Sequence, residues 1–227
     1  MVPIFQTPSK KDLQASHNIT HWVGIMNRIA IITIMVICLF PGCVSPERSM
    51  IEPTTGEEAG GRFTFESLTY SEDGSSRTSN LDSMAADEPT LLLWVGASCR
   101  GCNDWTDMLR EGIDNGSLAG ISVISIHRYS AFEQDEEVLV RYVGNDSENP
   151  IKWDIMLPDE DAAVVDLASG LIVDMGLYEA FQNPTTPTLQ IYLPDGSLNP
   201  LDHSYWADWG ELSGIFDSME SMSSGDR

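Results

Sequence analysis

Apolar residues in the second half of the chain occur in short runs separated by polar turns, which is the pattern of an α/β protein. Residues 91–95 form an apolar run of strand length, and residues 121–126 form a second strand-like run. Between them, Cys102, Trp105 and Leu109 recur at helical spacing. Two strands joined through a helix make a βαβ unit, so we expect parallel strands and a right-handed crossover.

The same patterning predicts further elements on both sides of this unit. Before it, we expect a strand over 62–70 and a short strand or turn over 78–84. After it, the pattern predicts a helix over 132–143, a strand over 151–157, a helix over 159–167, an ambiguous strand or helix over 170–177, a strand over 188–193, a turn at 194–197, a strand over 198–201 and a closing helix over 206–219.

Two of these helices have faces whose surroundings can be predicted. In the closing helix, Trp206, Trp209, Leu212 and Phe216 fall on one stripe, which we expect to pack in the core. In the helix over 132–143, the acidic residues between 133 and 137 are expected to form a solvated face rather than a metal site.

The N-terminal part of the chain resembles an export signal. Residues 1–25 have no usable periodicity, and we expect them to be an extension ahead of the true start at Met26. Arg28 then precedes an apolar run of 12 residues, 29–40. This run is shorter than the ~20 residues that span a bilayer and has the length of a signal-peptide core. Residues 26–42 are therefore expected to be a signal peptide.

Cys43 follows this run in a context that resembles the lipobox of prokaryotic lipoproteins, with Pro41 and Gly42 before it. The resemblance implies cleavage before Cys43 and a lipid on its sulfur. The alternative is an uncleaved anchor helix over 22–40. Both interpretations tether the rest of the chain to the membrane, outside the cytoplasm.

The remaining boundaries follow from composition. Residues 43–60 are rich in Pro, Gly, Thr and Glu without apolar rhythm, which is typical of a flexible linker. We expect a folded domain over 61–220 and a disordered tail over 221–227.

The chain is strongly acidic. Its 35 acidic and 12 basic residues give a formal net charge of −23. Such a charge argues against a nucleic-acid partner, because the phosphate backbone would be repelled. It fits a surface that is soluble in a salty medium, where charge is screened, and it equally fits general solubility.

The candidate chemistry lies in Cys99-Arg-Gly-Cys102, where the strand over 91–95 leads into the helix. A C-x-x-C at such a junction indicates a redox dithiol. The free amides and the macrodipole of the helix N-terminus stabilise a thiolate at Cys99, and Arg100 adds a positive charge. Cys99 is therefore the expected nucleophile and Cys102 the expected resolving thiol.

Three other interpretations of this cysteine pair remain open: a structural disulfide, half of a zinc site, or two core cysteines. Zinc needs about four ligands, whereas the chain has no second C-x-x-C and its four histidines form no ligand-like cluster. We therefore expect neither a metal nor another cofactor.

His127 ends the strand over 121–126 and should emerge near the cysteines, because the carboxyl ends of parallel strands meet at one edge of the sheet. A histidine at this place can act as a proton shuttle near neutral pH. The alternative is a surface histidine that merely ends a strand.

Two stretches together resemble the thioredoxin superfamily. LLLWVGASCRGC matches its strand and C-x-x-C motif, and PTTPTLQIYLPDG matches its cis-proline loop, strand and turn. The resemblance covers about residues 61–220 and is greatest to membrane-tethered, extracytoplasmic thiol-disulfide oxidoreductases related to cytochrome-maturation proteins. It implies an α/β, thioredoxin-like fold, with a central mixed sheet flanked by helices and an N-terminal β extension.

The resemblance also assigns roles. Pro187 would be the cis-proline, and the backbone of Thr186 before it would pair with an extended substrate, as in strand addition. Arg100 and Gly101 would support the dithiol from within the motif. The chain departs from the family at Ser98, where a tryptophan is usual, and at Leu93, where thioredoxin itself has a buried acid.

The implied activity is disulfide exchange, in which Cys99 attacks, a mixed disulfide forms and Cys102 resolves it. The partners would be protein thiols or disulfides outside the cytoplasm and a membrane-bound or soluble electron-transfer protein. One alternative is a thioredoxin-like binding module with a static disulfide. Another is a thiol peroxidase, which would need a Thr or Ser where Gly96 stands.

Overall fold

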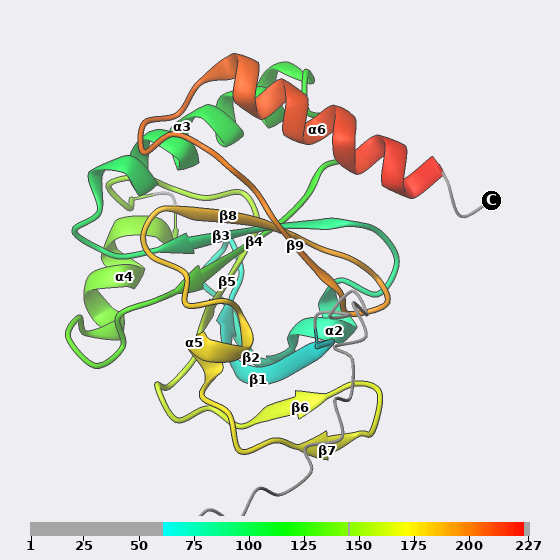
Figure 1. Cartoon of the computed structure of the whole chain (residues 1–227). Coiled ribbons are helices and arrows are strands. Elements are labelled where there is room, and N and C mark those ends of the chain that lie inside the picture. The colour runs from blue at the N-terminus through cyan, green and yellow to red at the C-terminus, as the bar shows by residue number, and fades with distance from the viewer. Residues whose placement is uncertain (1–60, 145, 225–227) are drawn as a thin grey trace, which may run out of the picture. The chain divides into compact units, whose positions relative to one another are not determined.

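The computed structural model describes residues 61–144 and 146–224, which form a nine-stranded sheet with helices on both faces (Figure 1). The predicted extension, signal peptide or anchor and linker, Cys43 among them, lie outside the described residues, as do residues 225–227. Among the residues that are described, no helix is long and apolar enough to cross a bilayer.

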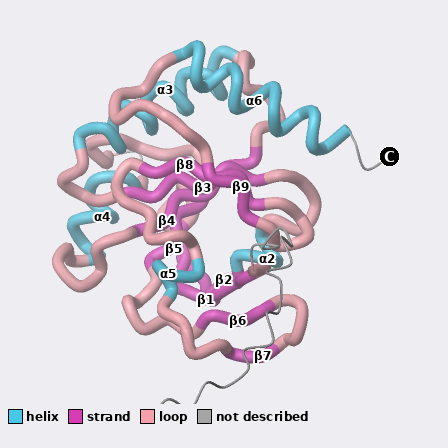
Figure 2. The backbone as a smooth tube through the Cα atoms, in the orientation of Figure 1, coloured by secondary structure: helices cyan, strands magenta, loops and turns pink. Residues whose placement is uncertain are grey.

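The elements alternate along the chain, and Figure 2 shows the central strands between α3 and α6 on one side and α2 and α5 on the other, with β6 and β7 beyond them. The strands are β1 (Phe63–Tyr70), β2 (Ser76–Asn80), β3 (Thr90–Val95), β4 (Ser122–His127), β5 (Asp154–Leu157), β6 (Val164–Asp166), β7 (Leu171–Ile172), β8 (Thr188–Tyr192) and β9 (Leu198–Pro200). The helices are α2 (Leu81–Met84), α3 (Arg100–Asn115), α4 (Asp135–Tyr142), α5 (Leu177–Ala180) and α6 (Trp209–Ser224).

The sheet is mixed, with the order β7-β6-β1-β5-β4-β3-β8-β9 and β2 paired to β1. β3 and β4 are parallel, from Thr90 opposite Ser122 to Val95 opposite His127, which confirms the predicted βαβ unit. β8 runs antiparallel to β3, and β9 antiparallel to β8, so the predicted hairpin is also confirmed. β1 and β2 form the predicted N-terminal β extension, since β1 pairs with β5 and β6 beyond the central strands.

Alternation along β3 divides the core between the two faces of the sheet. Leu91, Leu93 and Val95 pack on the side of α3, α4 and α6. Leu92 and Trp94 pack on the other side, against α2 and α5. All five residues are fully buried, as expected for a central strand covered by helices on both faces.

The predicted helix over 159–167 is wrong. The acids at its start resemble a first helical turn, but they form a turn that leads into β6. There Val164 and Val165 pair with β1, as suits β-branched residues. The ambiguous segment over 170–177 becomes β7, a loop and the start of α5, and Gly170 closes the β6–β7 turn with a φ of 70°.

The closing helix also differs from its prediction. α6 begins at Trp209 and continues to Ser224, beyond the predicted end. Its buried residues are Leu212, Ile215 and Met219, a stripe that shares only one position with the predicted one. Trp206 precedes the helix, and its side chain is exposed rather than in the core.

Candidate dithiol site

Cys99 begins the helix that carries the site. It is the N-cap of α3, in extended conformation, and its Sγ accepts a hydrogen bond from the Cys102 amide at 3.1 Å. Cys99 and Cys102 form a disulfide with their Cα atoms 5.3 Å apart, inside the ordinary range for a bridge. The sulfur that the sequence predicts as the nucleophile therefore lies at the positive end of the helix.

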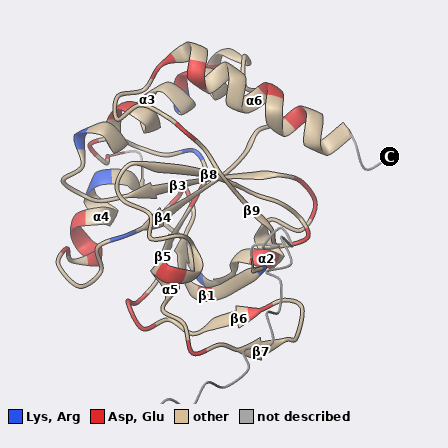
Figure 3. Cartoon of the chain, viewed as in Figure 1, with Lys and Arg blue, Asp and Glu red and all other residues tan. Residues whose placement is uncertain are grey.

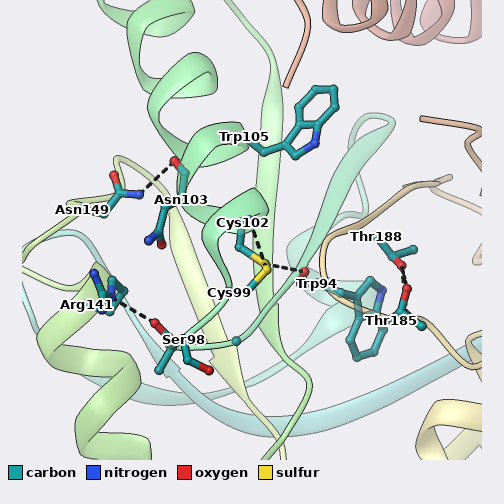
Figure 4. The surroundings of a disulfide bond; sticks show 12 residues. Trp94, Ser98, Cys99, Cys102, Asn103, Trp105, Arg141, Asn149, Thr185 and Thr188 are labelled. Carbon is teal, nitrogen blue, oxygen red and sulfur yellow. Dashed lines mark hydrogen bonds between the residues drawn. A yellow bond between two sulfur atoms is a disulfide. The ribbon is translucent and has the colours of Figure 1, made fainter. Parts of the chain in front are cut away.

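The two sulfurs differ in access. Cys99 is half-buried, whereas Cys102 is fully buried with its Sγ 3.8 Å from the Trp94 carbonyl oxygen (Figure 4). Arg100 is the first residue of α3, and its side chain is exposed. A molecule approaching from solvent thus meets Cys99 before Cys102.

Gly101 lies beneath Tyr205, a residue of the segment between β9 and α6. A Cβ atom at Gly101 would lie 2.4 Å from the Tyr205 carbonyl oxygen and 3.0 Å from its ring. Distances this short exclude a side chain, so the glycine of the motif is needed for close approach. Sequence reasoning did not identify Tyr205, because nothing local connects it to the motif.

The peptide groups just before Cys99 are held by residues around α4. Glu133 accepts hydrogen bonds from Ala97 N at 2.7 Å, from Ser98 N at 3.2 Å and from Ser98 Oγ at 2.7 Å. Arg141 Nε donates to the Ala97 carbonyl at 3.0 Å, and the Tyr142 hydroxyl donates to the Gly96 carbonyl at 2.9 Å. These contacts fix the loop that leads into the dithiol.

The role of Glu133 corrects a prediction. We expected residue 133 to belong to a solvated acidic face, but it precedes α4 and its carboxylate points at the cysteine loop. Its neighbours Glu136 and Glu137 are exposed as expected. Burial raises the pKa of Glu133, but hydrogen bonds from Ser98, Ala97 and His127 outweigh burial and hold the pKa below its usual value. Glu133 is therefore ionised at neutral pH.

His127 is fully buried, so the alternative of a surface histidine is wrong. Its Nε2 lies 3.3 Å from the Glu133 carboxylate, and its Nδ1 has no hydrogen-bond partner among the described residues. Burial lowers the pKa of His127, although the nearby Glu133 opposes this shift. His127 is thus neutral at neutral pH and donates from Nε2 to Glu133.

The Thr186–Pro187 peptide bond is cis, as the resemblance implies. The next residue, Thr188, begins β8 and lies opposite Trp94 near the end of β3. The proline loop and the dithiol are therefore at the same end of the sheet, and Figure 4 shows Thr185 and Thr188 across the disulfide from Arg141. Pro187 is buried and Thr186 is half-exposed.

Arg128, the residue after β4, holds the other end of this loop. Its Nε donates to the Pro184 carbonyl at 2.8 Å, and its guanidinium stacks 3.5 Å from the centre of the Tyr178 ring. Such a cation–π contact adds electrostatic attraction to the hydrogen bond. Arg128 therefore links the sheet to both α5 and the proline loop.

The structure brings most of the predicted site residues to one end of the sheet. Cys99, Arg100, Gly101 and Cys102 open α3, with Thr186–Pro187 before the neighbouring strand. No group of three or more His, Cys, Asp or Glu side chains within 61–144 and 146–224 is arranged to hold a metal ion.

The arrangement of these elements defines the class of fold. A βαβ unit is followed by an antiparallel hairpin and a final helix, with a C-x-x-C disulfide at the start of the first helix and a cis-proline before the hairpin. The chain therefore has a thioredoxin-like fold with extra N-terminal strands.

No family model and no curated protein matches the sequence. Among solved structures, the chain is similar to the thioredoxin domain of a thiol-disulfide oxidoreductase from Bacteroides vulgatus, with 13% identity and a TM-score of 0.42 over 70% of this chain and 95% of that one. A secreted Mycobacterium tuberculosis disulfide oxidoreductase homologous to E. coli DsbE is 15% identical, with a TM-score of 0.42 over 66% of this chain and 94% of that one. A reduced 2-Cys peroxiredoxin from Plasmodium vivax is 11% identical, with a TM-score of 0.48 over 70% and 93%. Identities and scores of this size transfer neither activity nor substrate to this chain.

Proposed function

We propose that the protein is a membrane-tethered, extracytoplasmic thiol-disulfide oxidoreductase that works through Cys99 and Cys102. The observation that carries the chemistry is the unequal access of the two sulfurs, because Cys99 at the helix N-terminus is half-exposed and Cys102 behind it is fully buried. An attacking thiol must reach its substrate, whereas a resolving thiol needs to reach only its neighbour.

The proposed reaction has two exchange steps. The Cys99 thiolate attacks one sulfur of a substrate disulfide, the substrate bond breaks, and the other substrate sulfur leaves as a thiolate. Cys102 then loses its proton and attacks Cys99 Sγ, which releases the second substrate thiol and leaves the Cys99–Cys102 disulfide. The substrate gains two electrons and the protein loses two, and the reverse sequence oxidises substrate thiols.

Removing only the resolving thiol tests this assignment. Cys102→Ser should accumulate mixed disulfides with partner proteins that dithiothreitol releases, because no neighbouring thiol displaces the substrate with the speed of an intramolecular step. Cys99→Ser should accumulate few. Non-reducing gels followed by mass spectrometry would measure both. Equal adducts in both variants, or none in either, would favour a static binding module instead.

The tether is a proposal from the sequence. Arg28, the apolar run over 29–40 and Gly42 before Cys43 support a lipid-modified N-terminus after cleavage. Cys43→Ser should then leave an uncleaved precursor without lipid, detected by its mass and by metabolic labelling with a fatty acid. Processing and localisation unchanged from wild type would support the anchor helix over 22–40.

A further inference from the structure

Two aromatic side chains stand out in solvent beside the dithiol. Tyr205 is 48% exposed and Trp206 is 56% exposed, and their rings meet edge to face with centroids 5.0 Å apart. Tyr205 also lies against Gly101, between the two cysteines. Aromatic side chains of this size are normally covered, so the exposure of a pair that adjoins the C-x-x-C motif through Gly101 calls for an explanation.

The backbone that carries this pair is held firmly in place. Trp105 Nε1 donates to the Ser204 carbonyl at 3.2 Å, and the Ala207 amide donates to Asp104 at 2.9 Å. The Leu189 amide donates to His203 Nε2 at 3.0 Å, which joins the segment to β8. None of these bonds uses the Tyr205 or Trp206 side chain. Tyrosine and tryptophan are also the residue types that are enriched in interaction hot spots.

The charges around the pair are acidic. The segment over 201–211 has Asp202, Asp208 and Glu211 and no lysine or arginine, and Asp104 reaches it from α3. Figure 3 shows acidic positions along this stretch of the chain and on α3. Arg100 is the basic residue of the motif itself. A partner segment with basic residues would match this rim better than an acidic one.

We propose that Tyr205 and Trp206 form a docking site for an extended, cysteine-containing segment of a partner polypeptide, which carries a large apolar side chain next to its cysteine and basic rather than acidic residues beyond it. The inference rests on the proposed function, because a partner whose sulfur bonds to Cys99 approaches the start of α3, where Tyr205 covers Gly101. The ring of Trp206 then covers the adjoining apolar side chain, while the acids face the basic residues.

The test compares reaction rates of chosen disulfides with the full-length, reduced Cys102→Ser protein. Each probe is a short cysteine peptide joined by a disulfide to thionitrobenzoate, so attack of Cys99 on the peptide sulfur releases one coloured thiolate. One peptide has phenylalanine beside cysteine and lysine further on. A second replaces the phenylalanine with serine, and a third replaces the lysine with glutamate. A mixed disulfide of thionitrobenzoate with mercaptoethanol reports on Cys99 without a peptide, once the rate of the Cys99→Ser, Cys102→Ser protein is subtracted for Cys38 and Cys43.

We expect the phenylalanine–lysine peptide to react fastest. Adding Trp206→Ala should slow that peptide by about three- to tenfold, the size of an aromatic contact, and should leave the serine peptide and the mercaptoethanol probe unchanged. Trp206→Phe should restore most of the rate. Ile172→Ala removes an apolar side chain that is 70% exposed on β7 and serves as the matched control. The difference in reaction rate between the lysine and the glutamate peptides should shrink near 1 M salt, where the Debye length is about 3 Å.

Several outcomes would overturn the inference. One is an unchanged rate of the phenylalanine peptide with Trp206→Ala, and another is an equal slowing of every probe, which would indicate damage to the dithiol. A glutamate peptide as fast as the lysine peptide at low salt would reject the cationic partner. Each of these leaves the proposed function standing, because the mercaptoethanol probe still reacts at Cys99. Failure of every probe with the parent protein would instead reject the proposed function, and the docking site with it.

Discussion

Removing the Glu133 carboxylate should destabilise the oxidised protein by about 2–4 kcal/mol. The carboxylate accepts a hydrogen bond from the buried Ala97 amide. The loss of a hydrogen bond to a charged group at a buried position costs about 1.5–3 kcal/mol. The two bonds from Ser98 lie at an exposed residue, where water can replace the carboxylate, so together they should add only about 0.5–1 kcal/mol. These contributions give the expected range for Glu133→Ala, and the loss of the bond from the buried His127 Nε2 adds to it.

Urea unfolding of the disulfide-intact protein at pH 7 measures this loss. Glu133→Gln keeps one carbonyl acceptor for Ala97 N and should lose less than Glu133→Ala. Glu136→Gln is the matched control, because this neighbouring acid is exposed and should change stability by no more than about 0.5 kcal/mol. A loss below about 1 kcal/mol for Glu133→Ala would refute the argument that this carboxylate holds the cysteine loop.

Two further predictions concern the same end of the sheet. Gly101→Ala should lower the free energy of unfolding by about 1–3 kcal/mol, because its Cβ overlaps Tyr205. Gly214→Ala, whose Cβ meets nothing within 4 Å, should be neutral or stabilising in the same urea titration. Burial lowers the pKa of His127 from 6.5, so the unfolded state binds its proton first. Stability should therefore fall as pH drops below about 6.5, by up to about 1.4 kcal/mol per pH unit from this group. His127→Leu should flatten that part of the stability–pH curve, and an unchanged slope would contradict the assignment.

Local patterns were enough to predict the centre of the fold. The run over 91–95, the C-x-x-C and the proline loop each carry their information within a few residues, and the structure has β3, the disulfide and the cis bond at those places. The spacing of strand, helix and strand indicated a βαβ unit with parallel strands, so the edge at which the site lies could also be predicted.

Contacts between distant parts of the chain could not be predicted in this way. Glu133 is 36 residues from Ala97, and its place before a helix rich in acids made it look like one more solvated carboxylate. Tyr205 meets Gly101 only because the segment between β9 and α6 is held against α3. The error at 159–167 has the same origin, because partners on β1 decide that Val164 and Val165 form a strand.

Cys99 is both the N-cap of α3 and one end of the disulfide. Its sulfur therefore already accepts a hydrogen bond from the Cys102 amide in the oxidised protein. A thiolate at the same atom is a stronger acceptor of that hydrogen bond. The helix thus keeps its cap whether the sulfur is bonded to Cys102 or carries a negative charge. Glu133 and Arg141 also hold Ala97, and Glu133 holds Ser98, so the loop before the cysteines has its hydrogen bonds in place in the oxidised protein. In the proposed reaction, each turnover would then begin from a loop that is already held in place.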